Sequence, residues 1–275
     1  MRLAVISDVH GNLFALEKAF DFIDRANVDG IIWCGDYITD ILLSSEVLEF
    51  IRLKNKKYKH WMIKGNREDY IIDYHNSSDK NFSHVDASDS LLYTYNSLSA
   101  ADIKFISSLP DEIVVDIKDC PKIYVRHKLN NKTNYKYNVF GHVHKQCLFV
   151  KDDAKFINPG SIGQCCSGSP GLEFSILELV NGEWSSHFYH ISYNLEYVTK
   201  FIRNSDLQLC KLHWCDVLIN TLESGHNYVD DYLNNVKKLA SGFGIDCNNL
   251  DNIPVKVWDY VYNNFKFEKS DKKVN

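Results

Sequence analysis

The sequence predicts a chain of the α+β / α/β class, in which a two-sheet β-sandwich is flanked by helices and followed by a C-terminal helical extension. Three observations support this class. In the first third, apolar runs alternate with helical segments, which is typical of parallel strands joined by helices. From residue 112 onward, short strands follow one another closely, which indicates a mostly antiparallel second sheet. Beyond about residue 193, apolar residues recur at helical spacing.

The first third begins with an apolar run at residues 2–7, which we expect to be a central strand covered on both faces. Asn12 is placed to cap the helix that follows. The elements expected here are, in chain order, a strand at 2–7, a helix carrying Leu13, Leu16, Phe20 and Ile23, a strand at 31–34, a helix at 44–54 and a strand at 60–63. This order predicts parallel strands.

The middle of the chain differs in character. Residues 76–90 are rich in Ser, Asp and Asn, and we interpret them as an exposed excursion. Ser99 and Asp102 have the spacing of a capping box, which opens a short helix that ends before Pro110. Asn181-Gly182 predicts a hairpin. The strands expected in this part are 112–118, 122–127, 136–140, 146–150, 154–157, 173–180 and 183–190.

The C-terminal part is expected to be helical. A last helix at 254–265 has Pro254 in its first turn, where proline is tolerated. We expect a sandwich domain at 1–192, a helical extension packed on it at 193–266, and a charged, disordered tail at 267–275. The apolar stripes that predict the other helices are Tyr197, Phe201 and Ile202, then Leu209, Leu212, Cys215 and Ile219, and then Tyr228, Tyr232, Val236 and Leu239.

Composition and charge exclude several classes of protein. The 275 residues are 45% hydrophobic and 24% charged, as in an ordinary soluble globular protein. A net charge of −5 and a pI near 6.1 argue against stable nucleic-acid binding, which favours a basic surface. Nucleotide substrates stay open, because bound cations would supply positive charge locally. No run approaches the roughly 20 apolar residues of a membrane span, so no membrane partner is expected.

The N-terminal residues lead at once into a polar cluster at Asp8, so we do not interpret them as a signal peptide. The eight cysteines are scattered and form no CxxC pair, although Cys165 and Cys166 are adjacent. Scattered cysteines of this kind are typical of reduced thiols, and we expect a cytoplasmic location. A redox or ligand role for Cys165 and Cys166 is a minor alternative.

Five short polar clusters stand where strands should end, and each contains a side chain able to bind a metal. They are Asp8-Val9-His10, Gly35-Asp36, Gly65-Asn66, Gly141-His142-Val143-His144 and Asn158-Pro159-Gly160-Ser161, and His127 ends a further strand. Strand ends can converge at one edge of a sheet, and ligands that converge there can hold two metal ions. Carboxylate, imidazole and amide ligands suit Mn²⁺, Fe²⁺ or Zn²⁺. Two ions sharing a hydroxide predict hydrolysis of a phosphoester.

With these clusters in this order, the chain resembles the calcineurin-like metallophosphoesterases over roughly residues 1–190. The family pattern DxH…GD…GN…H…GHxH is carried by Asp8 and His10, Gly35-Asp36, Gly65-Asn66, His127, and Gly141-His142-Val143-His144. The NPGS at 158–161 is similar to the small bacterial branch of phosphodiesterases, phosphatases and diadenosine-tetraphosphatase-like enzymes. The resemblance implies an α/β/β/α sandwich.

The resemblance also implies roles for individual residues. One metal would be held by Asp8, His10, Asp36 and His144, and the other by Asp36, Asn66, His127 and His142. Asn66 would also touch the substrate phosphate. Together with Arg67, whose role is a separate hypothesis, His10 and Asn66 are the predicted catalytic residues. The implied cofactors are two divalent ions, with Mn²⁺ favoured and Fe, Zn, Ni or Mg as alternatives. The competing interpretation is that Asn66 and the histidines only cap turns and complete hydrogen bonds.

Three departures from the family pattern concern the substrate pocket. Arg67 stands where the family usually has histidine, and arginine is no general acid at neutral pH. It can bind a phosphoryl oxygen and stabilise transition-state charge, and the alternative is a surface arginine paired with Glu68 or Asp69. Lys128 follows His127 in place of glycine and could contact a phosphate. Only residues 128–140 separate His127 from Gly141, where relatives often carry a longer insertion. The site is therefore expected either to be more open or to be closed by another element, namely the C-terminal helices or the 76–90 excursion.

We therefore predict a bimetal-dependent phosphoester hydrolase that acts through a metal-bridging hydroxide on a small phosphodiester, nucleotide or dinucleoside polyphosphate. The alternatives are a protein Ser/Thr phosphatase on the same site and a catalytically silent scaffold. The aromatic stripes of the C-terminal helices are interpreted as core, with a homodimer through these helices as the alternative. The histidines interpreted as surface or packing residues are His60, His75, His84, His187, His190, His213 and His226.

Overall fold

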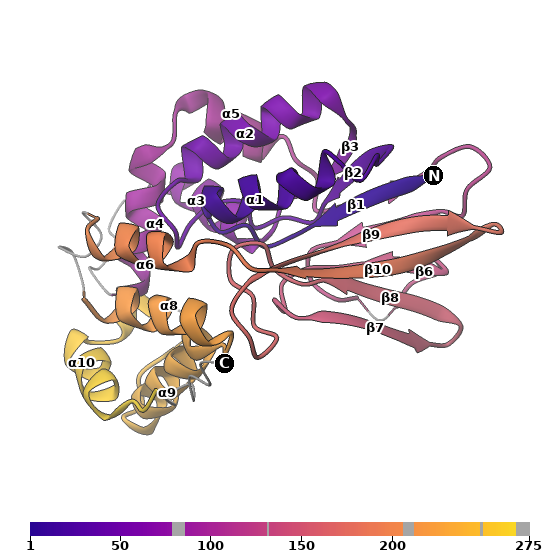
Figure 1. Cartoon of the computed structure of the whole chain (residues 1–275). Helices are drawn as coiled ribbons and strands as arrows, with labels where there is room; N and C mark the ends of the chain where they lie inside the picture. The colour runs from indigo at the N-terminus through magenta and orange to yellow at the C-terminus, as the bar shows by residue number, and fades with distance from the viewer. Residues whose placement is uncertain (79–85, 131, 206–211, 248–249, 268–275) are drawn as a thin grey trace, which may run out of the picture.

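A computed structural model describes residues 1–78, 86–130, 132–205, 212–247 and 250–267. Two five-stranded sheets pack face to face, and helices cover the outer face of the first sheet (Figure 1). The predicted two-sheet sandwich flanked by helices, with further helices after it, is confirmed. In the described part of the chain, no helix is both long and apolar enough to cross a membrane.

The first sheet has the strand order β10-β9-β1-β2-β3. Strands β1, β2 and β3 are parallel, as predicted, whereas β9 is antiparallel to β1 and β10 is antiparallel to β9. The hairpin around Asn181-Gly182 is therefore present but completes the first sheet. The strands are β1 (Arg2–Ile6), β2 (Gly30–Trp33), β3 (Lys59–Met62), β9 (Leu172–Val180) and β10 (Glu183–Ile191).

The second sheet has the order β4-β5-β6-β8-β7 and is mixed, so the expectation of a mostly antiparallel sheet is wrong. The two outer pairs are antiparallel, and β6 runs parallel to both of its neighbours. Parallel pairing arises because the neighbours of β6 are reached through crossovers rather than hairpins. The strands are β4 (Glu112–Val115), β5 (Ile123–Arg126), β6 (Tyr137–Val139), β7 (Gln146–Lys151) and β8 (Ala154–Pro159).

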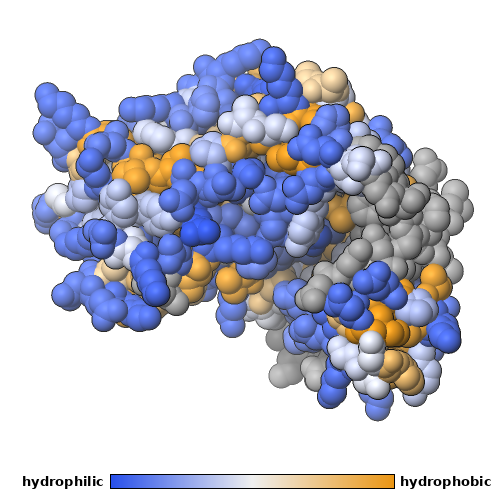
Figure 2. Space-filling view, turned by 180° about the vertical axis from the view of Figure 1, so that it is seen from behind, coloured by the Kyte–Doolittle hydropathy of each residue, from blue (hydrophilic) through white to orange (hydrophobic). Residues whose placement is uncertain are grey.

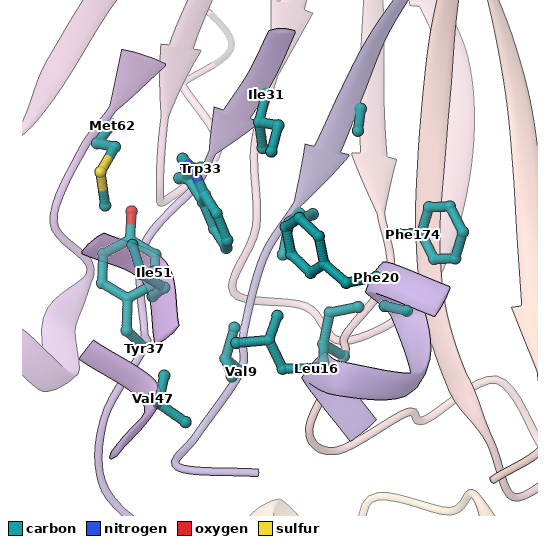
Figure 3. Packing of buried hydrophobic residues seen from close by; sticks show 14 of the residues in the cluster. Val9, Leu16, Phe20, Ile31, Trp33, Tyr37, Val47, Ile51, Met62 and Phe174 are labelled. Carbon is teal, nitrogen blue, oxygen red and sulfur yellow. The ribbon is translucent and has the colours of Figure 1, made fainter. Parts of the chain in front are cut away.

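Successive side chains of β1 point to opposite faces of the first sheet, so the core has two layers. Leu3 and Val5 pack between the sheets, while Ala4 and Ile6 face the helices. In the helix-covered layer, Phe20 of α1 stacks on Trp33 with 5.9 Å between ring centroids (Figure 3). Four of the helices that precede the second sheet are α1 (Leu13–Ile23), α2 (Ser44–Lys57), α3 (Asn66–Asn76) and α5 (Ala100–Ser107). Asn12 accepts a hydrogen bond from the Ala15 amide and caps α1, as predicted.

The expected excursion at 76–90 is corrected in part. Residues 79–85 lie outside the described residues, and a helix, α4 (Asp86–Ser97), begins at Asp86. Ser90 of α4 is buried, and its hydroxyl accepts a hydrogen bond from the Asp40 amide. The polar composition of this segment concealed the helix, because its buried face consists largely of small hydroxyl residues such as Ser90 and Thr94.

The C-terminal helices are α6 (Leu195–Arg203), α8 (Leu212–Ser224), α9 (Tyr228–Gly242) and α10 (Val255–Asn264), with the 3-10 turn η1 (Leu250–Asn252) before α10. Val198 and Ile202 of α6 pack against Ile41 and Leu42, so this helix contacts the segment after β2. Tyr197 is exposed, which corrects its place in the predicted stripe.

Helices α8, α9 and α10 share a separate apolar cluster. These helices still expose an apolar patch on the lobe at lower right in Figure 2, where Phe243, Val255 and Tyr260 are exposed. Leu209 and residues 268–275 of the expected tail lie outside the described residues. The division into domains at residue 192 stays a prediction.

Candidate metal centre

The site begins where β1 and β2 end side by side. The chain continues past both strands in register, because the amides of Asp8 and Val9 donate hydrogen bonds to the carbonyls of Gly35 and Asp36 at 3.0 and 2.8 Å. Asp8, His10 and Asp36 then adopt left-handed backbone conformations, with φ of 55°, 50° and 55°. This conformation is uncommon for residues other than glycine and concentrates at functional sites. It turns three potential ligands toward one edge.

The second sheet contributes the opposite wall. His127 follows β5, and His142 and His144 follow β6, both with positive φ. The His142 amide donates to both carboxylate oxygens of Asp8 at 3.1 Å, which joins the two walls. Gly141 permits this approach, because a Cβ there would lie 2.0 Å from the Ser7 hydroxyl.

The NPGS segment at 158–161 stabilises the contact between the two walls through hydrogen bonds to their backbone. The Asn158 amide group donates to the Gly141 carbonyl at 2.8 Å, and the Ser161 hydroxyl donates to the Asp8 carbonyl at 2.8 Å. Both side chains are buried. Their role is therefore to hold together the loops that carry Asp8 and His142.

The first group of potential ligands is Asp8, His10 and His144. Nε2 of His10 lies 3.0 Å from Nε2 of His144, and Nε2 of His144 lies 3.4 Å from Oδ1 of Asp8. One potential ligand atom from each of these residues lies within 4.8 Å of the others. Two imidazole nitrogens and a carboxylate oxygen at this spacing suit a divalent cation.

The second group is Asp36, His127 and His142, whose potential ligand atoms also lie within 4.8 Å of one another. Oδ2 of Asp36 lies 3.2 Å from Nε2 of His127 and 3.9 Å from Nε2 of His10. The same oxygen therefore faces one imidazole from each group. Oδ1 of Asp36 accepts a hydrogen bond from the Arg67 amide at 2.8 Å, which fixes the carboxylate.

Partners outside the two groups orient the imidazoles. Nδ1 of His127 donates to the Cys34 carbonyl at 2.7 Å, which leaves Nε2 as a lone-pair donor aimed at Asp36. Nδ1 of His10 lies 2.9 Å from Oδ2 of the buried Asp40. A hydrogen-bonded outer nitrogen is the usual arrangement for a metal-binding histidine.

Two buried polar atoms at the site have no hydrogen-bond partner, as expected for a site that binds cations. Oδ1 of Asn66 and Nε2 of His127 are buried and make no hydrogen bond. A buried polar atom without a partner costs about 1–3 kcal/mol, and a cation would remove that cost. Asn66 is the first residue of α3, next to Arg67, whose amide donates to Oδ1 of Asp36. The role of Asn66 as a ligand stays a prediction.

The electrostatics of the site also favour positive charge. Burial disfavours a charged imidazole, yet the carboxylates of Asp36 and Asp8 raise the pKa of His127 to about 9. Burial works against the charged form of Asp36 too, but His127 and His10 hold its pKa far below the usual range. A divalent cation bound here would supply positive charge to the same carboxylates.

Arg67 points into the fold rather than pairing with its neighbours. Its guanidinium lies 3.1 Å from Oδ2 of Asp40, and the side chain is 20% exposed. The alternative of a surface arginine paired with Glu68 or Asp69 is wrong, because Glu68 binds backbone amides and Asp69 pairs with Lys64.

Lys128 is exposed, and its charge contributes to lowering the pKa of His142, after burial and His127. Lys128 therefore lies near the second group, which contains His142.

Three supporting residues were not predicted from the sequence. Glu68 is buried and accepts hydrogen bonds from the amides of Asp36, Tyr37 and Gly65 at 2.9, 2.8 and 2.7 Å. Its place three residues after Gly65 is a capping-box signal that could have identified it. Asp40 and Gln164 had no such signal. Gln164 donates to Asp40 at 3.0 Å from a distant loop.

Comparisons with known proteins agree with this arrangement. The family model for the calcineurin-like phosphoesterase superfamily domain matches residues 1–182. Phosphodiesterase MJ0936 of Methanocaldococcus jannaschii is 23% identical over 186 residues, which cover 62% of this chain and 89% of that protein.

Two solved structures share the fold. Hypothetical protein PH1004 from Pyrococcus horikoshii has a TM-score of 0.67 and 16% identity, covering 82% of this chain and 98% of its own. A metallophosphoesterase from Sphaerobacter thermophilus has a TM-score of 0.62 and 20% identity, covering 82% and 100%.

Proposed function

The chain belongs to the calcineurin-like phosphoesterase superfamily and is a phosphoric ester hydrolase, and on that premise we propose that it hydrolyses small phosphodiesters, nucleotides or dinucleoside polyphosphates with two divalent metal ions. The observation that carries the proposal is the position of Oδ2 of Asp36, which lies between His127 and His10. A carboxylate oxygen shared by two ligand groups is what a two-metal site requires.

When bound, two divalent cations supply Lewis acidity that activates a water and offsets charge on phosphoryl oxygens. The residues that would hold them are Asp8, His10, Asp36, Asn66, His127, His142 and His144. This mixture of carboxylate, imidazole and amide favours Mn²⁺, with Fe, Zn, Ni and Mg as alternatives.

Arg67 and Asn66 are proposed to bind the substrate phosphate. Asn66 presents a carboxamide at the start of α3, and Arg67 presents a guanidinium held by Asp40. Arginine stabilises developing negative charge but cannot protonate a leaving group at neutral pH. The enzyme therefore favours substrates whose leaving groups depart without protonation, such as nucleoside polyphosphates and activated diesters. The relative from Methanocaldococcus jannaschii is named a phosphodiesterase, which supports this choice.

The test is hydrolysis of bis-(p-nitrophenyl) phosphate, first without metal and then with Mn²⁺. Asp36→Asn and Asn66→Ala should abolish Mn²⁺-dependent turnover. The matched control is Asp21→Asn, since Asp21 is an exposed residue of α1 that forms an ion pair with Lys18. Retained activity in Asp36→Asn would exclude the proposed site. A phosphopeptide hydrolysed faster than bis-(p-nitrophenyl) phosphate and a dinucleoside polyphosphate would instead identify a protein phosphatase. A cytoplasmic location and a homodimer through the C-terminal helices stay predictions.

A further inference from the structure

A second cluster of metal-binding side chains lies outside the candidate metal centre. It consists of Cys165, in the loop after β8, with Glu173 of β9 and His190 of β10, and one potential ligand atom from each lies within 4.8 Å of the others. Glu173 and His190 are register partners in the β9–β10 hairpin, so both side chains project from the same face of the sheet. The ends of β9 and β10 that carry them adjoin the helical part of the molecule (Figure 1).

The hydrogen bonds of His190 leave one ring nitrogen facing other acceptors. Nε2 of His190 lies 3.2 Å from the Pro170 carbonyl and 3.4 Å from the Ser169 hydroxyl, and a hydrogen on Nε2 can be donated to that carbonyl. In this tautomer Nδ1 presents a lone pair 3.2 Å from Oε1 of Glu173 and 3.9 Å from Sγ of Cys165. A lone pair beside a carboxylate oxygen needs a cation or a second proton between them.

The surrounding chain makes room for this convergence. Gly160 has φ of +83°, and a Cβ there would lie 2.2 Å from Oε2 of Glu173. A Cβ on Gly171 would lie 2.5 Å from Nε2 of His190. The Ser167 hydroxyl donates to Oε2 of Glu173 at 2.9 Å, which orients the carboxylate and leaves Oε1 toward the other two groups.

We propose that Cys165, Glu173 and His190 form a third metal site, which takes one Zn²⁺ ion. Thiolate, imidazole and carboxylate are the three ligand types that zinc uses in proteins, and a water or Ser169 would complete a tetrahedron. The two groups of the candidate metal centre contain no thiol, so this site differs in chemistry as well as position. Binding exchanges the thiol proton of Cys165, which now points to the Ser169 carbonyl, for the metal, and the proton passes to solvent.

A metal bound at this site would hold the loop between β8 and β9 in place, and this loop contacts the candidate metal centre and the C-terminal helices. On one side of Cys165, Ser161 braces the loop of Asp8. On the other side, the Gly168 amide donates to the Gly225 carbonyl, between α8 and α9, at 2.9 Å. Zinc bound here would cross-link this loop, which contacts both the candidate metal centre and the C-terminal helices, to the β9–β10 hairpin. His190, whose side chain is 32% exposed, provides the entry path.

Cobalt substitution tests the proposal directly. Co²⁺ added to the full-length, reduced protein should produce thiolate-to-cobalt charge-transfer absorption in the near ultraviolet, and one equivalent of Zn²⁺ beyond the binuclear complement should remove it. Cys165→Ser should abolish this absorption. Cys166→Ser is the matched control and should retain it, because the neighbouring Cys166 is not part of the cluster.

The second variant is His190→Ala, which changes a partly exposed residue and keeps the test valid if Cys165→Ser misfolds. It should weaken Co²⁺ binding by more than the roughly 10- to 100-fold that loss of an outer-shell partner typically costs. Two results would overturn the proposal. Absence of the absorption in the wild-type protein at excess Co²⁺ would mean that no thiolate–metal bond forms at this cluster. Absorption lost in Cys166→Ser but kept in Cys165→Ser would assign the thiolate to Cys166 beside His144.

Discussion

Asp40 lies at the centre of a chain of contacts that no metal-binding motif reveals. Its Oδ2 atom meets Nδ1 of His10 at 2.9 Å, the guanidinium of Arg67 at 3.1 Å and the Gln164 amide at 3.0 Å. The burial of this carboxylate opposes its charge, yet Arg67 and His10 hold the pKa of Asp40 at about 2. One buried carboxylate therefore positions both a potential metal ligand and the cation proposed to bind substrate.

Replacing Arg67 by Ala should lower kcat/KM for bis-(p-nitrophenyl) phosphate by on the order of 10²-fold, the effect of removing one preorganised donor from a transition state. The loss should appear mainly in kcat, since the charge that Arg67 stabilises develops in the reaction. Arg126→Ala is the control, because Arg126 lies on the exposed end of β5. Steady-state kinetics within a few-fold of wild type on every active substrate would show that Arg67 has no catalytic role.

The Glu68 carboxylate is expected to contribute to stability as well as to the shape of the site. Glu68→Gln replaces an oxygen acceptor by an amide donor opposite backbone N–H groups, so at least one buried donor loses its partner. We expect the free energy of unfolding to fall by about 1–3 kcal/mol. Urea denaturation measures this loss, with Glu17→Gln on the exposed face of α1 as control. An unchanged midpoint would mean that the loop of Asp36 does not depend on this clamp.

At the scale of elements, Asp24 links the end of α1 to the end of α2. Its carboxylate accepts hydrogen bonds from Lys54 at 2.7 Å, Lys57 at 2.9 Å and the Tyr58 hydroxyl at 2.5 Å. Burial opposes the charge, but these partners lower the pKa of Asp24 from 3.8 to about 2. Because the folded pKa is depressed, the stabilisation is present above about pH 4 and is lost as the pH falls toward 2.

Asp24→Asn should therefore destabilise the protein by on the order of 1 kcal/mol at pH 7, a value discounted for the partial exposure of the pair. The difference from wild type should shrink between pH 4 and pH 2.5, where the wild-type carboxylate begins to protonate. Urea midpoints of both proteins at pH 7, 4 and 3 provide the measurement. A difference that stays constant over this range would assign the effect to lost packing rather than to charge.

Local signals predicted most elements, and long-range pairing accounts for the errors. The Asn12 cap and the strand ends at Asp8 and Asp36 are encoded within a few neighbouring residues. The place of β9 beside β1 is not, because it depends on contacts between residues 170 or more positions apart. The predicted hairpin also contained information on strand register that was not used. A two-residue turn at 181–182 pairs Val180 with Glu183, and counting outward places Glu173 opposite His190.

The candidate ligands were predictable from the sequence, but the residues that support them were not. Seven potential ligands stand in recognisable motifs, and the structure brings six of them into two groups, while Asn66 begins α3. Asp40 and Gln164 carry no motif, since each acts through a contact between distant loops. His190 was interpreted as a surface or packing residue, because its partners Cys165 and Glu173 meet it only after both strands and the loop have folded.

At the scale of the whole molecule, the candidate metal centre joins the two sheets. Asp8, His10 and Asp36 follow strands of the first sheet, and His127, His142 and His144 follow strands of the second. Metals bound there would cross-link the sandwich. A ligand at 100 times its Kd stabilises the folded state by about 2.7 kcal/mol, which corresponds to roughly 5–10 °C in Tm for a chain of this size.

Removing metal should therefore lower the melting temperature. We expect the Mn²⁺-loaded protein to lose roughly 5–10 °C after treatment with EDTA and dialysis, and to regain it when Mn²⁺ is restored. Differential scanning fluorimetry measures both steps. Asp36→Asn should show a smaller response to EDTA, because the shared ligand is gone. If the wild-type Tm changes by less than about 1 °C although metal analysis shows the ions removed, the metals do not cross-link the sheets.

The position of β1 between β2 and β9 has a consequence for synthesis on the ribosome. Strand β2 emerges soon after β1, but β9 ends only at Val180. About 140 residues separate β2 from β9, so one edge of β1 lacks its partner strand while they are synthesised. An unpaired apolar strand edge invites pairing with other chains. The nascent protein must therefore be shielded until the hairpin arrives, and a truncation just before β9 would yield an aggregation-prone chain rather than a smaller enzyme.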